Sequence, residues 1–242
     1  MSSDLESLYP FLYAETSDLP AVLAEVRAST IAKTEEITAL RQEIARRDGT
    51  RIASCARDMA ARFAAGGRLF AFGNGGSATD AAQLATLFLH PPAFADRAGD
   101  ALPLPPLPLP AFGLANDTSV VTALGNDIGV DVVFARQLGA FGRAGDIAVG
   151  LSTSGNSANL LRAFDEAARR GMLTIGLAGY EGGKMAELSS IDYLFVAPSA
   201  SIHRIQEAQT TIYQVLWELT AAEVSHVSRD SGGDRVDRPR PA

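Results

Sequence analysis

The sequence predicts an α/β protein whose five-stranded parallel sheet is covered by helices on both faces. From residue 68 onward, five short apolar runs alternate with stretches of helical periodicity, the order expected of repeated βα units. Each run has the length of a strand, and most are apolar on both faces, as in parallel strands that are buried on each side. The predicted strands are residues 69–72, 112–115, 147–151, 173–177 and 193–196.

A helical extension over residues 1–66 is predicted to precede the sheet. Apolar side chains recur there every three or four residues with charged residues between them, which is the period of an amphipathic helix. The pair Gly66-Gly67 ends the region. The apolar positions are Ile37, Leu40, Ile44, Ile52, Cys55, Met59 and Phe63.

The remaining predicted helices lie between or after the strands. We expect one domain over residues 67–227 and a disordered tail over residues 228–242, where glycine, proline and nearly balanced charges replace the periodic pattern. The predicted helices are residues 79–89, 130–141, 158–170, 184–188 and 202–227.

Composition excludes several classes of protein. The 242 residues are 47% hydrophobic and 20% charged, as in globular chains, and the net charge of −7 disfavours a direct nucleic-acid partner. The single cysteine, Cys55, excludes a disulfide framework, and the acidic start lacks the apolar core of a secretory signal. We therefore expect a cytoplasmic protein with no membrane partner.

An uncharged run over residues 101–115 is too short to span a membrane and contains five prolines. Each proline inside a helix costs about 3 kcal/mol. The run therefore predicts an extended surface loop.

The first predicted strand leads into a glycine loop, residues 73–77, whose sequence is Gly-Asn-Gly-Gly-Ser. Glycines allow the backbone N–H groups to approach a ligand, and the helix that follows adds unpaired donors, so a phosphate or carboxylate fits there. No Gly-Lys-Ser/Thr follows, which excludes a P-loop. Dinucleotide binding is disfavoured because the acidic ribose partner expected about 20 residues later is missing.

The third predicted strand leads into a serine loop, residues 152–157, with four hydroxyl side chains within six residues. A hydrogen bond to a charged oxygen contributes about 1.5–3 kcal/mol, so three or four could hold a phosphate without Lys or Arg. A serine-rich turn alone is usually only a helix cap. Two such loops on alternate βα units would open on one sheet edge, where open α/β sheets bind ligands.

These residues also carry a family resemblance. The chain resembles the sugar isomerase (SIS) domain family, in the group of sedoheptulose-7-phosphate isomerases and a bacterial replication-initiator-associating protein. The resemblance covers roughly residues 20–225 and implies a flavodoxin-like three-layer sandwich, a helical N-terminal arm used in oligomerisation, and usually a homotetramer. The motifs are residues 73–77, Asn116-Asp117, residues 125–127, Gly145-Asp146, residues 152–157, 182–186 and 204–207.

The resemblance further implies a phosphosugar whose phosphate is held by Ser77 and the serine loop, with Asp117 at a site position. On the last helix, a polar and charge-poor face contains His203, Gln206, Glu207, Thr210 and Gln214, which suits a lined cavity or a subunit contact. The expected substrate-binding residues are Asn74, Gly75, Gly76, Ser77, Asp117, Ser152, Thr153, Ser154, Ser157 and Gln206.

The chain departs from the group's isomerases at the positions that would move protons or bind zinc. Gln83 stands where they have a histidine, Thr86 and Leu87 where they have two glutamates, and Gln209 and Gln214 where they have two more histidines. Glutamine is not a base near neutral pH and is a poor zinc ligand. We therefore expect no metal and no cofactor.

Three functions remain open. The first is a phosphosugar-binding protein that acts as a sensor, a partner-binding module or a divergent isomerase. The second is an active aldose–ketose isomerase of the phosphoheptose isomerase type that uses Glu207 as its base, helped by His203. The third is a protein–protein adaptor that uses an oligomer surface and the proline-rich loop.

Overall fold

Five parallel strands form one sheet in the order β2-β1-β3-β4-β5, in a computed structural model that describes residues 19–92 and 107–230. This order and the parallel pairing confirm the predicted flavodoxin-like α/β architecture. Register is continuous across the sheet, with Leu69 opposite both Ala111 and Ile147. The strands are β1 (Leu69–Gly73), β2 (Ala111–Gly113), β3 (Ile147–Ser152), β4 (Leu173–Gly179) and β5 (Tyr193–Ala197).

The three central strands are buried along their whole length, whereas the edge strands β2 and β5 are partly exposed. Burial on both faces explains why the central runs contain few polar residues.

Two helices cover one face of the sheet. These are α5 (Val133–Phe141) and α6 (Ala158–Arg169), which pack on each other and on the central strands. Phe72 of β1 meets the rings of Phe134 and Phe164 at centroid distances of 5.6 and 5.3 Å. This aromatic cluster is part of the core between the sheet and the two helices.

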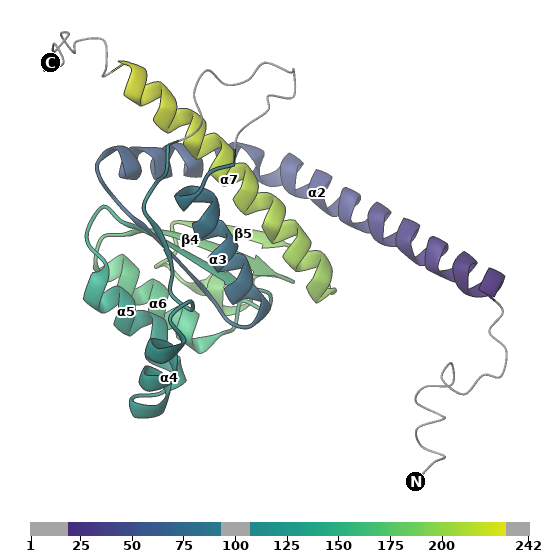
Figure 1. Ribbon diagram of the computed structural model, residues 1–242, viewed down its shortest axis with the longest axis horizontal. Coiled ribbons are helices and arrows are strands. Elements are labelled where there is room, and N and C mark those ends of the chain that lie inside the picture. The colour runs from purple at the N-terminus through teal and green to yellow at the C-terminus, as the bar shows by residue number, and fades with distance from the viewer. Residues whose placement is uncertain (1–18, 93–106, 231–242) are drawn as a thin grey trace, which may run out of the picture. The chain divides into compact units, whose positions relative to one another are not determined.

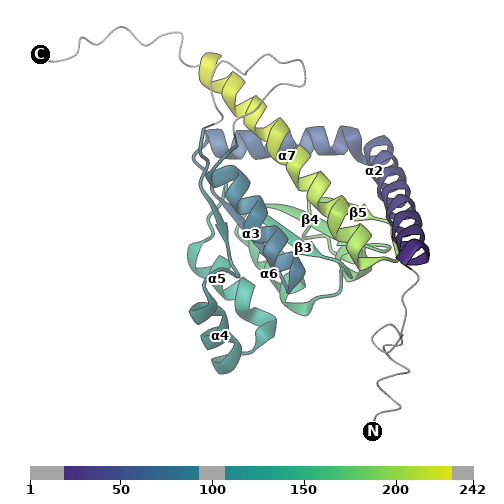
Figure 2. The ribbon, with the colours of Figure 1, turned by 45° about the vertical axis from the view of Figure 1, so that its right-hand side comes forward.

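The other face is covered by α3 (Gly76–Leu89) and α7 (Ile202–Asp230), and the second half of α2 (Leu19–Ala64) packs against both of these helices. Figures 1 and 2 both show α3 and α7 side by side over this face. The rings of Phe63 in α2 and Phe88 in α3 lie 5.3 Å apart, and Thr220 of α7 donates to the Ala56 carbonyl of α2. The predicted sandwich of helices, sheet and helices is therefore confirmed.

The chain divides into two compact units, with the boundary between Ala39 and Leu40 inside α2. In the described part of the first unit, residues 19–36 of the helix are all exposed. Residues 1–18 of the predicted extension, residues 93–106 of the proline-rich loop and residues 231–242 of the predicted tail lie outside the described residues.

Several predicted boundaries were wrong. The sequence pattern missed α4 (Thr118–Asp127), a ten-residue helix with no fully buried residue and only a short apolar stripe, Val120, Val121 and Leu124. The helix predicted over residues 130–141 is a short 3₁₀ turn, η2 (Val130–Val132), followed by α5, and the one predicted over 184–188 is the 3₁₀ turn η3 (Gly183–Glu187). Helix α7 continues to Asp230, so residues 228–230 do not belong to a disordered tail.

Within residues 19–92 and 107–230, no helix has both the length and the apolar character needed to cross a bilayer.

Candidate functional site

The glycine loop and the serine loop follow adjacent strands, because β1 and β3 are neighbours in the sheet. After β1 the chain moves outward to β2, and it then returns to place β3 on the other side of β1. Connections that leave neighbouring strands in opposite directions open a crevice at the carboxyl edge, where open α/β sheets bind ligands. Both loops lie at this switch point.

The glycine loop turns directly into helix α3. The N–H of Ser77 donates to the Asn74 carbonyl and the N–H of Ala78 to that of Gly75, both at 3.0 Å. Ser77 is 6% exposed, while Asn74, Gly75 and Gly76 are exposed. The loop therefore presents its backbone at the start of a 14-residue helix, where the helix dipole is positive.

The serine loop is held in shape by its own hydroxyl groups. Ser152 Oγ accepts from the Gly155 N–H at 3.1 Å and lies 3.3 Å from Ser157 Oγ, and Ser154 Oγ accepts from the Asn156 N–H at 3.2 Å. A hydroxyl that accepts a backbone N–H still has its own proton to donate. Ser154 can thus donate to an anion without losing this contact.

The start of η3 supports the serine loop from behind. The Met185 N–H donates to the Gly155 carbonyl and the Lys184 N–H to Asn156 Oδ1, both at 3.0 Å. A Cβ on Gly155 would lie 2.0 Å from the Gly182 carbonyl oxygen, so only glycine permits this contact. The Gly182-Gly183 motif therefore supports the loop.

A reciprocal amide pair joins the two loops. Asn74 Nδ2 donates to Asn159 Oδ1 at 2.9 Å, and Asn159 Nδ2 donates back to Asn74 Oδ1 at 2.9 Å. Asn159 lies in the first turn of α6 and is 4% exposed. The prediction that the two loops share one sheet edge is confirmed, and we call residues 73–77 with residues 152–157 the hydroxyl cradle.

Helix α7 contacts both loops through glutamine side chains. Gln206 Nε2 donates to Asp80 Oδ2 at 3.3 Å, and a Cβ on Gly76 would lie 2.5 Å from the same nitrogen, so the amide lies against the glycine loop. Buried Gln209 donates from Nε2 to the Ser152 carbonyl at 3.3 Å. Further along, Tyr213 Oη donates to Gln83 Oε1 of α3 at 2.9 Å.

The contacts described above include neither of the residues predicted for catalysis, Glu207 and His203, nor Asp117, which was predicted to bind substrate. Glu207 is partly buried and forms an ion pair with Arg204, with 3.0 Å between Oε2 and Nη1. His203 is exposed in the first turn of α7. Asp117 is exposed and caps α4, where its Oδ1 accepts from the Val120 N–H at 3.1 Å.

Asp80 is a carboxylate that the sequence analysis did not select. Burial raises the pKa of Asp80, and the hydrogen bond from Gln206 offsets part of this rise. Burial also raises the pKa of Tyr213, with a smaller contribution in the same direction from Asp80. We define Asp80, Gln83, Gln206 and Tyr213 as the α3–α7 seam, a polar contact in which Asp80 and Tyr213 each form a hydrogen bond to a glutamine.

A hollow of about 750 Å³ opens beside the serine loop. Ser154 and Asn156 form one wall, and Tyr180 and Glu181, after β4, form another. The Tyr180 backbone has a φ of 52°, a conformation that non-glycine residues rarely adopt. Space is therefore available at the carboxyl edge next to the cradle.

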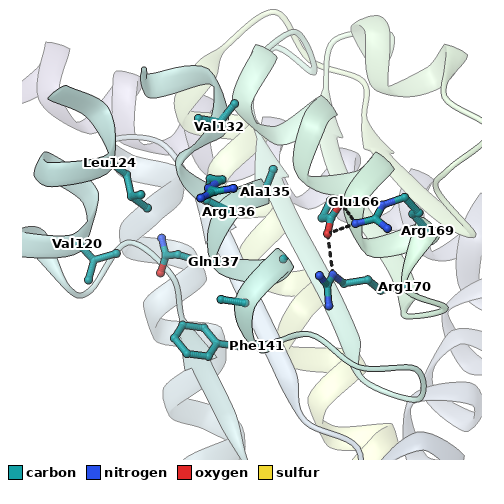
Figure 3. Close-up of a pocket in the computed structure, with 12 residues that line it drawn as sticks. Val120, Leu124, Val132, Ala135, Arg136, Gln137, Phe141, Glu166, Arg169 and Arg170 are labelled. Atoms are coloured by element: carbon teal, nitrogen blue, oxygen red, sulfur yellow. Dashed lines mark hydrogen bonds and ion pairs between the residues drawn. The ribbon is translucent and has the colours of Figure 1, made fainter. Parts of the chain in front are cut away.

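A second hollow, of about 600 Å³, lies between α4, α5 and α6 (Figure 3). Its lining contains no residue of the cradle. Glu166 accepts hydrogen bonds there from Arg169 and Arg170. Burial alone would raise the pKa of Glu166, but the two arginines hold it below its usual range. Glu166, Arg169 and Arg170 thus satisfy one another in this hollow.

Comparison with known proteins places the chain in a family. A model of the SIS domain matches residues 34–179. The chain belongs to the SIS-domain family. Its relatives place it in the phosphoheptose isomerase group of that family, as the motifs predicted.

Two curated relatives are named phosphoheptose isomerase. One, from Pelodictyon phaeoclathratiforme, is 43% identical over 181 residues, which is 74% of this chain and 81% of the relative. The other, from Nitratidesulfovibrio vulgaris, is 40% identical over 196 residues, 81% of this chain and 88% of the relative. The solved phosphoheptose isomerase of Neisseria gonorrhoeae superposes with a TM-score of 0.71 at 33% identity and covers 81% of this chain and 99% of that one.

Of the site residues predicted for this SIS domain, the structure brings the two loops and Gln206 together and leaves Asp117 and His203 exposed. Asn159, Asp80 and Tyr213 were missed. A sequence signal existed for Asp80, which follows Gly76 by four residues and therefore lies on the same helix face as the loop. No local signal pairs Asn159 with Asn74, which are 85 residues apart.

Proposed function

We propose that this chain binds a phosphorylated sugar at the carboxyl edge of its sheet, as a phosphosugar-binding protein of the phosphoheptose isomerase group. The phosphate would occupy the hydroxyl cradle and accept hydrogen bonds from Ser77, Ser152, Ser154 and Ser157. Asn74, Gly75, Gly76, Thr153 and Gln206 would surround the sugar end. The observation that carries the proposal is the Asn74–Asn159 pair, which holds two donor-rich loops beside each other.

The same proposal holds that the usual proton-transfer groups have been replaced. Leu87 offers no polar group, Gln83 Oε1 is engaged by Tyr213, and Gln209 donates to the Ser152 carbonyl. Zinc does not fit this donor set, and residues 19–92 and 107–230 contain no group of three His, Cys, Asp or Glu side chains able to hold a metal. Binding is therefore proposed without a metal or cofactor, as a sensor or a partner-binding module.

Calorimetric titration with sedoheptulose 7-phosphate tests the proposal, with free sedoheptulose, inorganic phosphate and NAD as comparison ligands. We expect saturable binding of the sugar phosphate, weaker binding of phosphate and none of NAD. If no sugar phosphate binds, the proposal is wrong.

Active isomerisation is the second candidate. It is favoured by relatives named phosphoheptose isomerase at 40–43% identity and by two carboxylates, Asp80 and Glu207, near the cradle. Aldose–ketose interconversion needs a base at the reacting carbons and an acid at the carbonyl, roles assigned here to Glu207 and His203. NMR of sedoheptulose 7-phosphate with the protein should then show turnover that Glu207→Gln abolishes and that added zinc does not raise.

The assembly and setting of the protein belong to the same proposal. We expect a homo-oligomer, dimer or tetramer, in the cytoplasm, with residues 1–66 as a helical arm and residues 67–227 as the ligand-binding domain. A protein partner would bind the oligomer surface. Light scattering coupled to size exclusion measures the oligomeric state.

A further inference from the structure

The α3–α7 seam contains two glutamines whose amide groups are each oriented by a neighbour. Asp80 accepts from Gln206 at 3.3 Å and Tyr213 donates to Gln83 at 2.9 Å. The two contacts join helices that are more than 100 residues apart in sequence, and both lie on the cradle's side of the sheet. The seam is therefore a tertiary contact between α3 and α7 that contains two side-chain hydrogen bonds.

Asp80 decides which end of the Gln206 amide is used. An ionised carboxylate can only accept hydrogen bonds, so Gln206 must turn its Nε2 toward Asp80. The carbonyl oxygen is left as the other polar atom of the amide, and it lies 3.6 Å from the position of a Cβ on Gly76. No donor among residues 19–92 and 107–230 forms a hydrogen bond to this oxygen.

Tyr213 orients the Gln83 amide in the opposite way, because it bonds the amide oxygen and not the amide nitrogen. Its hydroxyl has one proton, which it donates to Gln83 Oε1. The exposed Gln83 side chain then offers its Nε2, a donor. The seam thus presents an amide oxygen from α7 and an amide nitrogen from α3, whereas the cradle contributes hydroxyl and backbone donors.

We propose that Asp80 is a positioning residue that sets Gln206 to accept a hydrogen bond from a hydroxyl of the bound sugar, and so distinguishes a phosphosugar from phosphate alone. This inference rests on the proposed function and deepens it. The phosphate needs donors, which the cradle supplies. A sugar hydroxyl has a proton to donate, and Gln206 Oε1 is placed to accept it beside the glycine loop.

The key variant is Asp80→Asn, which keeps the size of the side chain but can donate as well as accept. The Gln206 amide can then adopt either orientation, so the acceptor facing the sugar is no longer fixed. We expect sedoheptulose 7-phosphate to bind about 3- to 10-fold more weakly, the worth of one hydrogen bond. Binding of inorganic phosphate should stay within about twofold of the wild type, since phosphate does not use Gln206.

A compensating variant tests orientation directly. In Asp80→Asn with Gln206→Glu, the new Asn donates to the new carboxylate, whose second oxygen is again an acceptor. We expect sugar-phosphate affinity to return to within about threefold of the wild type, because the orientation of the acceptor is fixed again. Asp165→Asn, at an exposed position of α6, is the matched control for loss of one negative charge and should change neither affinity.

Calorimetry with both ligands on all four proteins decides between the outcomes. Equal losses for sugar phosphate and phosphate in Asp80→Asn, an unchanged sugar affinity, or failure of the double variant to recover would each overturn the positioning role while leaving the proposed function intact. A wild-type chain that binds neither ligand would overturn both. Circular dichroism checks that every variant is folded.

Discussion

The two edges of the same sheet treat their polar groups in opposite ways. At the amino edge, Asp146 is 3% exposed and pairs with Arg68 at 2.7 Å, and it also accepts from the backbone N–H groups of Arg68 and Arg143. Arg68 Nη2 also donates a hydrogen bond to the Phe141 carbonyl at 2.7 Å. Both charged groups, Asp146 and Arg68, are therefore satisfied within the protein.

At the carboxyl edge, the cradle consists of neutral hydroxyl, amide and glycine residues, and several of its donors have no hydrogen-bond acceptor among residues 19–92 and 107–230. Ser154 accepts from a backbone N–H and keeps its proton, and Asn74 and Gly75 are exposed. Satisfied charges indicate a structural role, whereas donors held in place without acceptors indicate a site prepared for a ligand. The two edges should therefore respond differently to mutation.

The largest effect is expected at the amino edge. Asp146→Ala removes the partner of a partly buried guanidinium and two acceptors of backbone N–H groups, so the free energy of unfolding should fall by about 3 kcal/mol. Urea denaturation followed by circular dichroism measures it. Asp131→Ala removes an exposed ion pair with 3.9 Å between its charged atoms and should change the free energy by less than about 0.5 kcal/mol. Similar losses in the two variants would contradict the structural assignment of this edge.

At the carboxyl edge the effect should be on binding and not on stability. Ser154→Ala removes one hydroxyl donor to the phosphate, and we expect the affinity for sedoheptulose 7-phosphate and for inorganic phosphate to fall about tenfold or more. The melting temperature should move by less than about 2 °C. Ser190→Ala, at a hydroxyl that donates to Asp165 away from the cradle, is the matched control. A large loss of stability in Ser154→Ala with unchanged ligand affinity would contradict a binding role of this edge.

The smallest expected effect is the contribution of Asp80 to stability, and the sign of this contribution is what the experiment tests. Asp80 has a folded-state pKa above its ordinary value of 3.8, because burial disfavours its charge. Between 3.8 and that raised pKa the folded protein binds more protons than the unfolded chain, so stability falls as pH rises through this window.

Asp80→Asn removes this penalty and should raise the melting temperature at pH 7 by about 1–2 °C. The gain should disappear at about pH 2.5, well below 3.8, where the carboxyl is protonated in both the folded and the unfolded state. Scanning calorimetry at the two pH values gives the sign, and a lower melting temperature at pH 7 would contradict the prediction. A variant that is more stable but binds sugar less well is what a site residue should give.

Much of the fold could be predicted because the central strands have a simple local signature. The runs that became β1, β3 and β4 are apolar except for Thr174 in β4 and Ser152 at the end of β3, as burial on both faces favours. Helix α4 could not be predicted in the same way, because none of its side chains is buried. Its start does carry a signal, since Asp117 is a good capping residue and accepts from the Val120 N–H.

For the site, the sequence was informative where chemistry is local and silent where it depends on tertiary contacts. The glycine and serine loops are continuous segments that follow strands, so their composition predicted their place. Asp80 and Gln206 are 126 residues apart, and their contact exists only because α7 lies on α3. The seam therefore became visible only with the structure.

The cradle's lack of any formal charge has a consequence for how a ligand would arrive and stay. Residues 73–77 and 152–157 include no Lys, Arg, Asp or Glu, and the whole chain carries a net charge of −7. The cradle therefore provides no long-range electrostatic attraction for a dianion. Binding begins only when the oxygens of the dianion come within hydrogen-bond distance of the hydroxyl and amide groups. Short-range contacts of this kind are weakly screened by salt. The fraction of sites occupied would therefore depend on ligand concentration and little on ionic strength. Bulky polyanions would not bind more tightly because of their larger charge.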